Sequence, residues 1–207
     1  MRDTRERIML AALQLFARDG YEAVPVSSIA GELGITKGAL YRHFRDKRDI
    51  FESILRRMEQ NDAESAGAHE LPGDSAEAQP EAYAAASLPE IIAFSRDMFR
   101  YWTEDEFASA FRRMLTLEQY RSAEMARLYA QYLSAGPLEY VRELMRALGF
   151  ADPEGAALSL CGPMFLLYAV YDAAEDKSAV TASLDAHLDK VLEELQAERS
   201  RYELSEK

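Results

Sequence analysis

Apolar residues recur along the chain at helical spacing, and no stretch alternates in the manner of a β-strand. Before residue 61 the pattern predicts helices over Asp3 to Arg18, Val26 to Leu33 and Lys37 to Phe44, and a fourth that begins after the capping residue Asp46. Gly20 and Gly34 follow the first two, where a glycine ends a helix at low steric cost. The pattern predicts an all-α fold.

Residues 61–87 interrupt this periodicity. They are rich in Ala, Glu, Ser, Gly and Pro, which indicates a flexible or partly helical connector. Helical spacing then predicts elements over 88–101, 104–120, 122–148, 153–174 and 181–202. A break or kink is expected at Gly136-Pro137 and a kink at Gly162-Pro163. The predicted organisation is a domain of residues 1–60, a connector of 61–87 and a larger helical domain of 88–207.

The segment from Val26 to Phe44 predicts two short helices joined by a glycine turn. The apolar face of the first helix is Val26, Ile29, Ala30 and Leu33. Thr36 is placed to cap the second helix, which opens with the small residues Gly38 and Ala39. Two helices around such a turn are typical of a helix-turn-helix, whose second helix enters the DNA major groove.

Net charge first argues against DNA binding, because the 207 residues carry −12. Residues 1–60, however, hold 11 Lys and Arg against 9 Asp and Glu, whereas residues 61–207 hold 13 against 27. The positive residues around the motif are Lys37, Arg42, Arg45, Lys47 and Arg48. Phosphate contacts need such local charge, and the acidic remainder would orient the protein on DNA. The alternative is a set of solvated helix faces.

Residues 5–55 resemble the amino-terminal domain of the TetR family of transcriptional regulators (TetR/AcrR type). The positions that carry the resemblance are Ile8, Ala11, Ala12, Phe16, Gly20, Ile29, Ala30, Gly34, Lys37, Gly38, Leu40, Tyr41, Phe44, Lys47 and Leu55. The resemblance implies an amino-terminal three-helix DNA-binding domain and a larger helical domain that dimerises and binds a small effector.

The resemblance also implies DNA contacts at bases or phosphates. In one position this chain departs from the family, because Val24-Pro25 replaces the usual Ser or Thr before the second helix, so we expect Ser27 and Ser28 to take over that phosphate contact. Arg42 offers a guanidinium that suits guanine. The expected DNA-contacting residues are Ser27, Ser28, Thr36, Lys37, Gly38, Ala39, Tyr41, Arg42, His43 and Lys47. Leu40 and Phe44, at i and i+4, are expected in the core.

The larger domain is expected, from the resemblance, to dimerise through its last two helices and to bind an unknown effector. The stripe Leu184, Leu188, Val191 and Leu195 suits either a partner or the domain's own core. Candidate pocket residues are Met98, Trp102, Phe111, Met114, Met125, Tyr129, Tyr132, Cys161, Met164, Phe165 and Tyr168. These side chains suit binding of an adaptable apolar ligand and equally suit packing in the core. The excess of acidic residues in this domain leaves a cationic effector as an alternative.

No motif for catalysis, a cofactor or a metal is found: there is no phosphate loop, GxSxG, HExxH or dinucleotide fingerprint. The single cysteine, Cys161, lies in an apolar run without an adjacent base, which favours an inert thiol in a reducing cytoplasm. The longest apolar run, Pro163 to Tyr171, is shorter than the roughly 20 residues that cross a bilayer, and the charged amino terminus does not resemble a signal peptide.

These observations favour a homodimeric, ligand-responsive transcriptional regulator, most simply a repressor that a small apolar effector releases from a near-palindromic operator. Two alternatives remain. One is a helical dimer that acts through a protein partner or as an activator. The other is a ligand-binding or enzymatic domain that carries a vestigial DNA-reading head.

Overall fold

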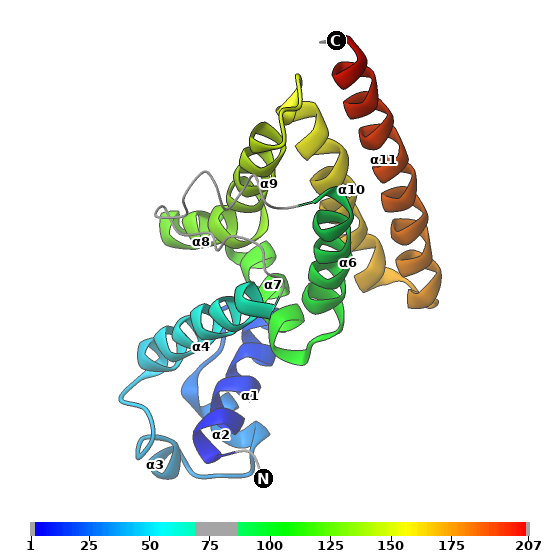
Figure 1. Ribbon diagram of the computed structural model, residues 1–207. Coiled ribbons are helices and arrows are strands. Elements are labelled where there is room, and N and C mark those ends of the chain that lie inside the picture. Colours follow the sequence, from blue (N-terminus) through cyan, green and yellow to red (C-terminus); the bar gives the residue numbers. More distant parts are fainter. Residues whose placement is uncertain (1–2, 69–86, 206–207) are drawn as a thin grey trace. The chain divides into compact units, whose positions relative to one another are not determined.

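The structure is a computed structural model that describes residues 3–68 and 87–205, with side chains described for 3–61 and 87–201. Within these ranges the backbone forms α-helices and turns and no β-strand, which confirms the all-α prediction. The chain forms two compact units (Figure 1). Unit 1 holds Met1–Glu64 and Asp105–Tyr129, and unit 2 holds Ser65–Glu104 and Ala130–Lys207.

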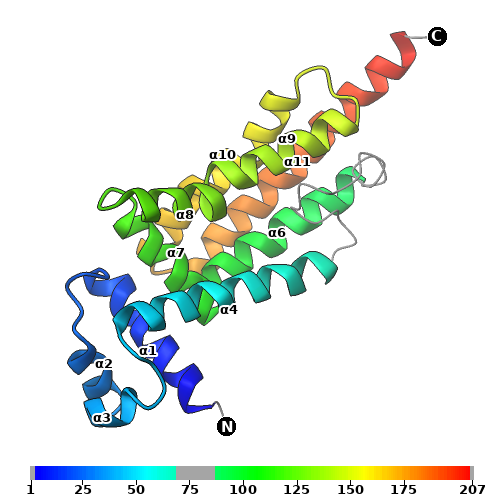
Figure 2. The ribbon, with the colours of Figure 1, turned by 90° about the vertical axis from the view of Figure 1, so that its left-hand side faces the viewer.

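Unit 1 is built around the amino-terminal helices. Its helices are α1 (Thr4–Asp19), α2 (Val26–Glu32), α3 (Lys37–Leu40), most of α4 (Lys47–Ala68), α7 (Glu106–Glu118) and the start of α8 (Ala123–Leu133). The helix α2 contacts α1 and α3, and α7 packs along α1 (Figure 2). The largest fully buried side chains include Phe16, Leu40, Phe44, Phe51 and Phe111, so the predicted core positions Leu40 and Phe44 are confirmed.

The second helix of the motif is shorter than predicted. It is α-helical over Lys37–Leu40, and residues 41–43 form a turn. There the N–H of His43 donates to the carbonyl of Leu40 at 2.9 Å, an i→i+3 bond that tightens the chain. A four-residue helix that contains a glycine has little stability of its own, so tertiary contacts decide where it ends.

The units do not follow the predicted domain boundaries throughout. Residues 105–129, expected in the larger domain, group with the amino-terminal helices. Part of the predicted connector, residues 61–68, is helical and completes α4. Residues 69–86 of that connector lie outside the described residues. Periodicity along the chain reports that a helix has an apolar face, but not which neighbour covers it.

Unit 2 contains α6 (Leu88–Glu104), α9 (Ala135–Ala147), α10 (Pro153–Ala173) and α11 (Lys177–Ser205). The helix α10 contacts α6, α9 and α11, and α6 also contacts α11, as Figures 1 and 2 show. The helix α11 begins at Lys177, four residues before the predicted Thr181. The carboxylate of Asp176 caps this start by accepting the N–H of Ser178 at 3.0 Å.

The predicted break in 122–148 is present but lies at Ser134, between α8 and α9. Pro137 then falls in the first turn of α9, where a helix tolerates the missing N–H. At Gly136 a Cβ atom would collide with the carbonyl oxygen of Gln131. Glycine is therefore required there by the close approach of the backbone.

By length and composition, the whole of α10 is apolar enough to cross a membrane, although the uninterrupted apolar run within it, Pro163 to Tyr171, is too short to do so. The same test is passed by core helices of globular domains, and α10 buries Ala157, Leu160 and Met164 within unit 2. Its contacts with α6, α9 and α11 cover one side of the helix, and 39% of its apolar window is buried.

Candidate nucleic-acid interface

Backbone hydrogen bonds hold the turn between α2 and α3. Gly34 has φ +64°, and its N–H donates to the carbonyl of Gly31 at 3.0 Å. The N–H of Ile35 donates to the carbonyl of Ala30 at 3.0 Å. A residue with a side chain would be strained in this left-handed conformation, which explains the glycine.

The start of α3 is capped as the sequence predicts. The hydroxyl oxygen of Thr36 accepts the N–H of Ala39 at 3.1 Å. Beside it, a Cβ atom on Gly38 would meet only that hydroxyl oxygen within 4 Å, at 3.9 Å. The first turn of α3 is therefore open to a large ligand.

The predicted DNA-contacting residues lie at or near the surface. Exposed residues are Ser27, Ser28, Thr36, Lys37, Gly38, Tyr41 and Arg42, and half-buried ones are Ala39, His43 and Lys47. Tyr41 has 50% of its surface exposed, which is high for an aromatic residue. Lys37 and Arg42 have no ion-pair partner among the described side chains.

Comparison with known proteins identifies the family that the amino-terminal domain resembles. A profile described as "Bacterial regulatory proteins, tetR family" matches residues 8–54. The HTH-type transcriptional repressor BepR of Brucella suis biovar 1 is 49% identical over 55 residues, which are 27% of this chain and 26% of BepR. The HTH-type transcriptional regulator AcrR of Shigella flexneri is 41% identical over 59 residues, 28% and 27% of the two chains. Residues 8–54 are therefore similar to the amino-terminal domain of the tetR family of bacterial regulatory proteins.

The chain matches these curated relatives over about a quarter of their own length. Solved structures cover far more of the chain. The SmeT–triclosan complex has a TM-score of 0.62 at 20% identity and covers 92% of this chain and 90% of its own. A transcriptional regulator from Aquifex aeolicus VF5 has a TM-score of 0.64 at 17% identity, with coverages of 91% and 99%. The chain therefore shares its all-α fold with these regulators over most of its length.

Lys47 lies differently from the other residues expected to contact DNA. Its ammonium donates to the carbonyl of Tyr21 at 2.8 Å and to that of Glu22 at 3.2 Å, and it sits 4.4 Å from the centroid of the Tyr21 ring. Two of its three hydrogens are thus used within the protein. Lys47 therefore holds the loop between α1 and α2.

Arg48, counted in the basic cluster, is neutralised by two carboxylates. Its guanidinium donates to both oxygens of Glu124 at 2.8 and 2.6 Å and to Glu52 at 3.0 Å. The hydrogen bonds to Glu124 and then to Glu52 raise the pKa of Arg48, and Arg48 in turn lowers the pKa of Glu124. Of the cluster, Lys37, Arg42 and Arg45 keep strongly exposed side chains.

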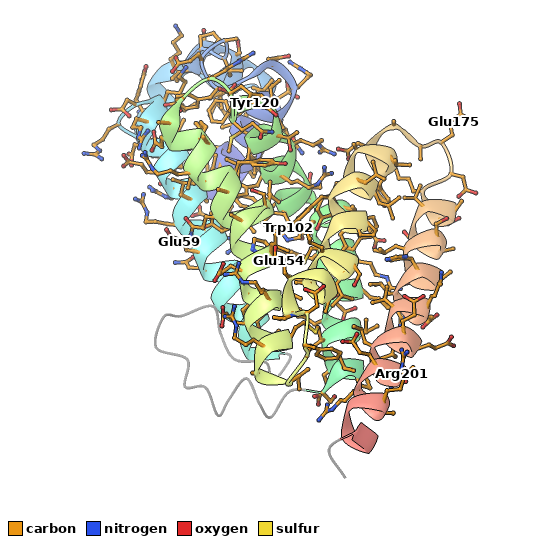
Figure 3. The ribbon with its side chains drawn as sticks, turned by 90° about the horizontal axis from the view of Figure 1, so that it is seen from above. Glu59, Trp102, Tyr120, Glu154, Glu175 and Arg201 are labelled. Atoms are coloured by element: carbon orange, nitrogen blue, oxygen red, sulfur yellow. The ribbon has the colours of Figure 1, made fainter. Side chains whose placement is uncertain are left out.

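A buried carboxylate from α7 also holds the loop between α1 and α2. Glu118, 2% exposed, accepts the N–H of Tyr21 at 3.0 Å and the guanidinium of Arg121 at 2.9 Å. Gly20 has φ +88°, and a Cβ atom there would lie 2.7 Å from Glu118 Oε1. The turn that follows α7 carries the exposed Tyr120 (Figure 3). Sequence reasoning missed Glu118 because its partner is 97 residues away.

The residues predicted for the effector pocket divide between the two units. Phe111, Met114, Met125 and Tyr129 lie in unit 1, and Met98, Trp102, Tyr132, Cys161, Met164, Phe165 and Tyr168 lie in unit 2. Phe111 and Met114 are fully buried on α7, which packs against α1. These two side chains therefore belong to the core of unit 1.

The unit 2 candidates include a group of aromatic rings. The ring centroids of Trp102 (Figure 3) and Tyr132 are 6.5 Å apart, and the ring of Tyr168 stacks on Phe99 at 5.4 Å. Cys161 is buried, and burial raises the pKa of its thiol to about 12, so the thiol is unreactive near neutral pH. The described residues contain no group of His, Cys, Asp and Glu placed to hold a metal ion.

Proposed function

We propose that the chain is a homodimeric transcriptional repressor of the cytoplasm that binds a near-palindromic DNA operator and leaves it when a small apolar effector binds. The observation that carries this proposal is the exposed group Lys37, Tyr41 and Arg42 on and just after the capped helix α3. Lys37 and Arg42 have no carboxylate partner among the described side chains, although the whole chain carries a net charge of −12. DNA phosphates would supply the missing negative charge.

Each side chain has a distinct role in this proposal. The Tyr41 hydroxyl donates to a phosphate, and the Lys37 ammonium acts as a compact charge beside it. Arg42 reads a guanine through its forked guanidinium. Tyr41→Phe removes only the hydroxyl, so it should weaken binding to every sequence by a similar factor.

Dimerisation is proposed through α10 and α11. Leu158, Leu166 and Val170 of α10 are 49%, 67% and 43% exposed, and their spacing puts them along one face of the helix. Gly162 on the same face is also exposed. A row of exposed aliphatic residues of this kind marks a surface that another molecule covers, and a second copy is the simplest occupant for a symmetric operator.

The leucine stripe of α11 does not take part in this face. Leu184, Leu188, Val191 and Leu195 are at most 5% exposed and lie in the core of unit 2. Of the two roles that the sequence left open for this stripe, the core is the one it has. The exposed alanines of α11, Ala182 and Ala186, would allow a close approach of the partner helix.

An effector is proposed to bind among the aromatic and methionine side chains of unit 2, which suit a large apolar molecule. The effector releases DNA only if it binds more tightly to the state in which the two recognition helices are wrongly spaced. Chain connections between the units lie at Glu64–Ser65, Glu104–Asp105 and Tyr129–Ala130. Motion in unit 2 would reach the helix-turn-helix through α4 and α7.

Selection of bound duplexes from a random pool, at two salt concentrations, tests the proposal. The expected result is one near-palindrome with half-sites about 34–36 Å apart and an affinity that falls steeply with salt. A folded dimer that enriches no sequence would refute the repressor function and favour action through a protein partner.

A further inference from the structure

Arg5, in the first turn of α1, reaches the end of the helix-turn-helix. Its Nη1 donates to the carbonyl of His43 at 2.9 Å and its Nη2 donates to the hydroxyl oxygen of Ser53 at 2.9 Å. Its Cζ lies 4.3 Å from the centroid of the Phe44 ring. The planar guanidinium of Arg5 therefore links α1 to the segment that follows α3 and to α4.

The carbonyl of His43 lies where the chain needs a donor. Helical geometry ends at Leu40, and the next residues close by i→i+3 bonds, with the N–H of His43 bonded to the carbonyl of Leu40. Carbonyls at such an end have no donor within the helix and carry partial negative charge. The guanidinium of Arg5 supplies both a donor and a positive charge.

The surroundings strengthen this contact. Phe44 is 1% exposed and Ser53 is 5% exposed, so water competes little for the donors of Arg5. The hydroxyl oxygen of Ser53 also accepts from Arg56 at 2.7 Å. Arg45 directly follows Phe44, and its N–H donates to the carboxylate of Asp49 on α4 at 2.9 Å. The segment that follows α3 is thus fixed to α4 by polar contacts on both sides of Phe44.

We propose that Arg5 is a positioning residue for DNA recognition. It fixes the segment of Tyr41, Arg42 and His43 against α4, and it does so without contacting DNA. The fork of two N–H donors is what the arrangement requires, because one donor holds the backbone of the motif and the other holds α4. This inference rests on the proposed DNA-binding function.

The test compares Arg5→Met with Arg7→Met, using the duplex that the wild-type chain enriches from a random pool. Arg7 is on the same helix and is exposed, so its replacement removes the same charge without the contact to His43. Arg5→Met should weaken binding by about tenfold, the effect of losing a charged hydrogen bond. Arg7→Met should bind within about twofold of wild type.

The salt dependence separates positioning from a phosphate contact. Loss of a phosphate contact lowers the slope of log affinity against log salt by about 0.9. The slope for Arg5→Met should equal that of wild type. A lowered slope, or an affinity within about twofold of wild type, would overturn the inference.

Amide hydrogen exchange without DNA supplies an independent result. Arg5→Met should increase exchange at residues 41–45 and leave exchange in α6, α10 and α11 unchanged, whereas Arg7→Met should change neither. Unchanged protection at residues 41–45 would contradict the inference, even if wild type enriched no duplex and the repressor function itself failed.

A second substitution covers the case in which Arg5→Met does not fold. Arg5→Lys keeps the positive charge and a long side chain, but its single ammonium group cannot bridge two separate acceptors as the forked guanidinium does. We expect it to bind more weakly than wild type, with an unchanged salt slope. Binding equal to wild type would show that charge alone, and not the fork, is required.

Discussion

Replacing Glu118 by alanine should destabilise unit 1, because this carboxylate joins α7 to the loop between α1 and α2. The substitution leaves the N–H of Tyr21 without the acceptor that it has at 3.0 Å. An unsatisfied, partly buried N–H costs about 1–3 kcal/mol. The ion pair with Arg121 adds about 0–1 kcal/mol at most, since Arg121 is 48% exposed. The expected loss is about 2 kcal/mol.

Thermal unfolding followed by far-ultraviolet circular dichroism, at one fixed protomer concentration, measures this loss. For a chain of this size about 2 kcal/mol corresponds to a fall in Tm of about 4–8 °C. Glu118→Gln is the matched control, since its amide oxygen can still accept the N–H of Tyr21. It should lower Tm by less than about half as much. Equal losses in the two variants, or none in either, would refute the role assigned to the Tyr21 hydrogen bond.

Three other outcomes are expected. Lys47→Ala should lower Tm in the absence of DNA, because it frees the carbonyls of Tyr21 and Glu22; an unchanged Tm would contradict the contacts of its ammonium. Leu166→Asp should give a folded monomer in sedimentation analysis, and a dimer would show that the interface lies elsewhere. Cys161, whose thiol pKa is raised to about 12, should react slowly with a thiol reagent at pH 8 in the folded protein and quickly in urea.

Local features of the motif could be predicted because they depend on residues close together in the chain. The cap from Thr36 to the N–H of Ala39 spans three residues, and the left-handed turn at Gly34 depends on one. The apolar positions Leu40 and Phe44 are one helical turn apart. Such interactions follow from spacing alone, so the helix-turn-helix and its exposed recognition helix are visible in the sequence.

Partners of long polar side chains could not be predicted in this way. Arg48 forms an ion pair with Glu124, 76 residues away in the chain. Lys47 donates hydrogen bonds to two carbonyls of the α1–α2 loop. Each of these side chains has several rotamers. Packing brings distant backbone carbonyls and carboxylates close to it, and these groups select the rotamer. The sequence therefore overstates how much of the basic cluster is available to DNA.

The helical fold, the helix-turn-helix and its caps can be predicted from the sequence alone, because they depend on periodicity and on hydrogen bonds within one or two turns. Packing in three dimensions was needed to show that residues 105–129 group with the amino-terminal helices. It was also needed to show that the Leu188 stripe of α11 is buried and that Leu166 of α10 is exposed. It also joined Arg5 to the carbonyl of His43, 38 residues along the chain. An apolar stripe on a helix must be buried against a neighbouring element, but the packing of the whole unit sets which element that is.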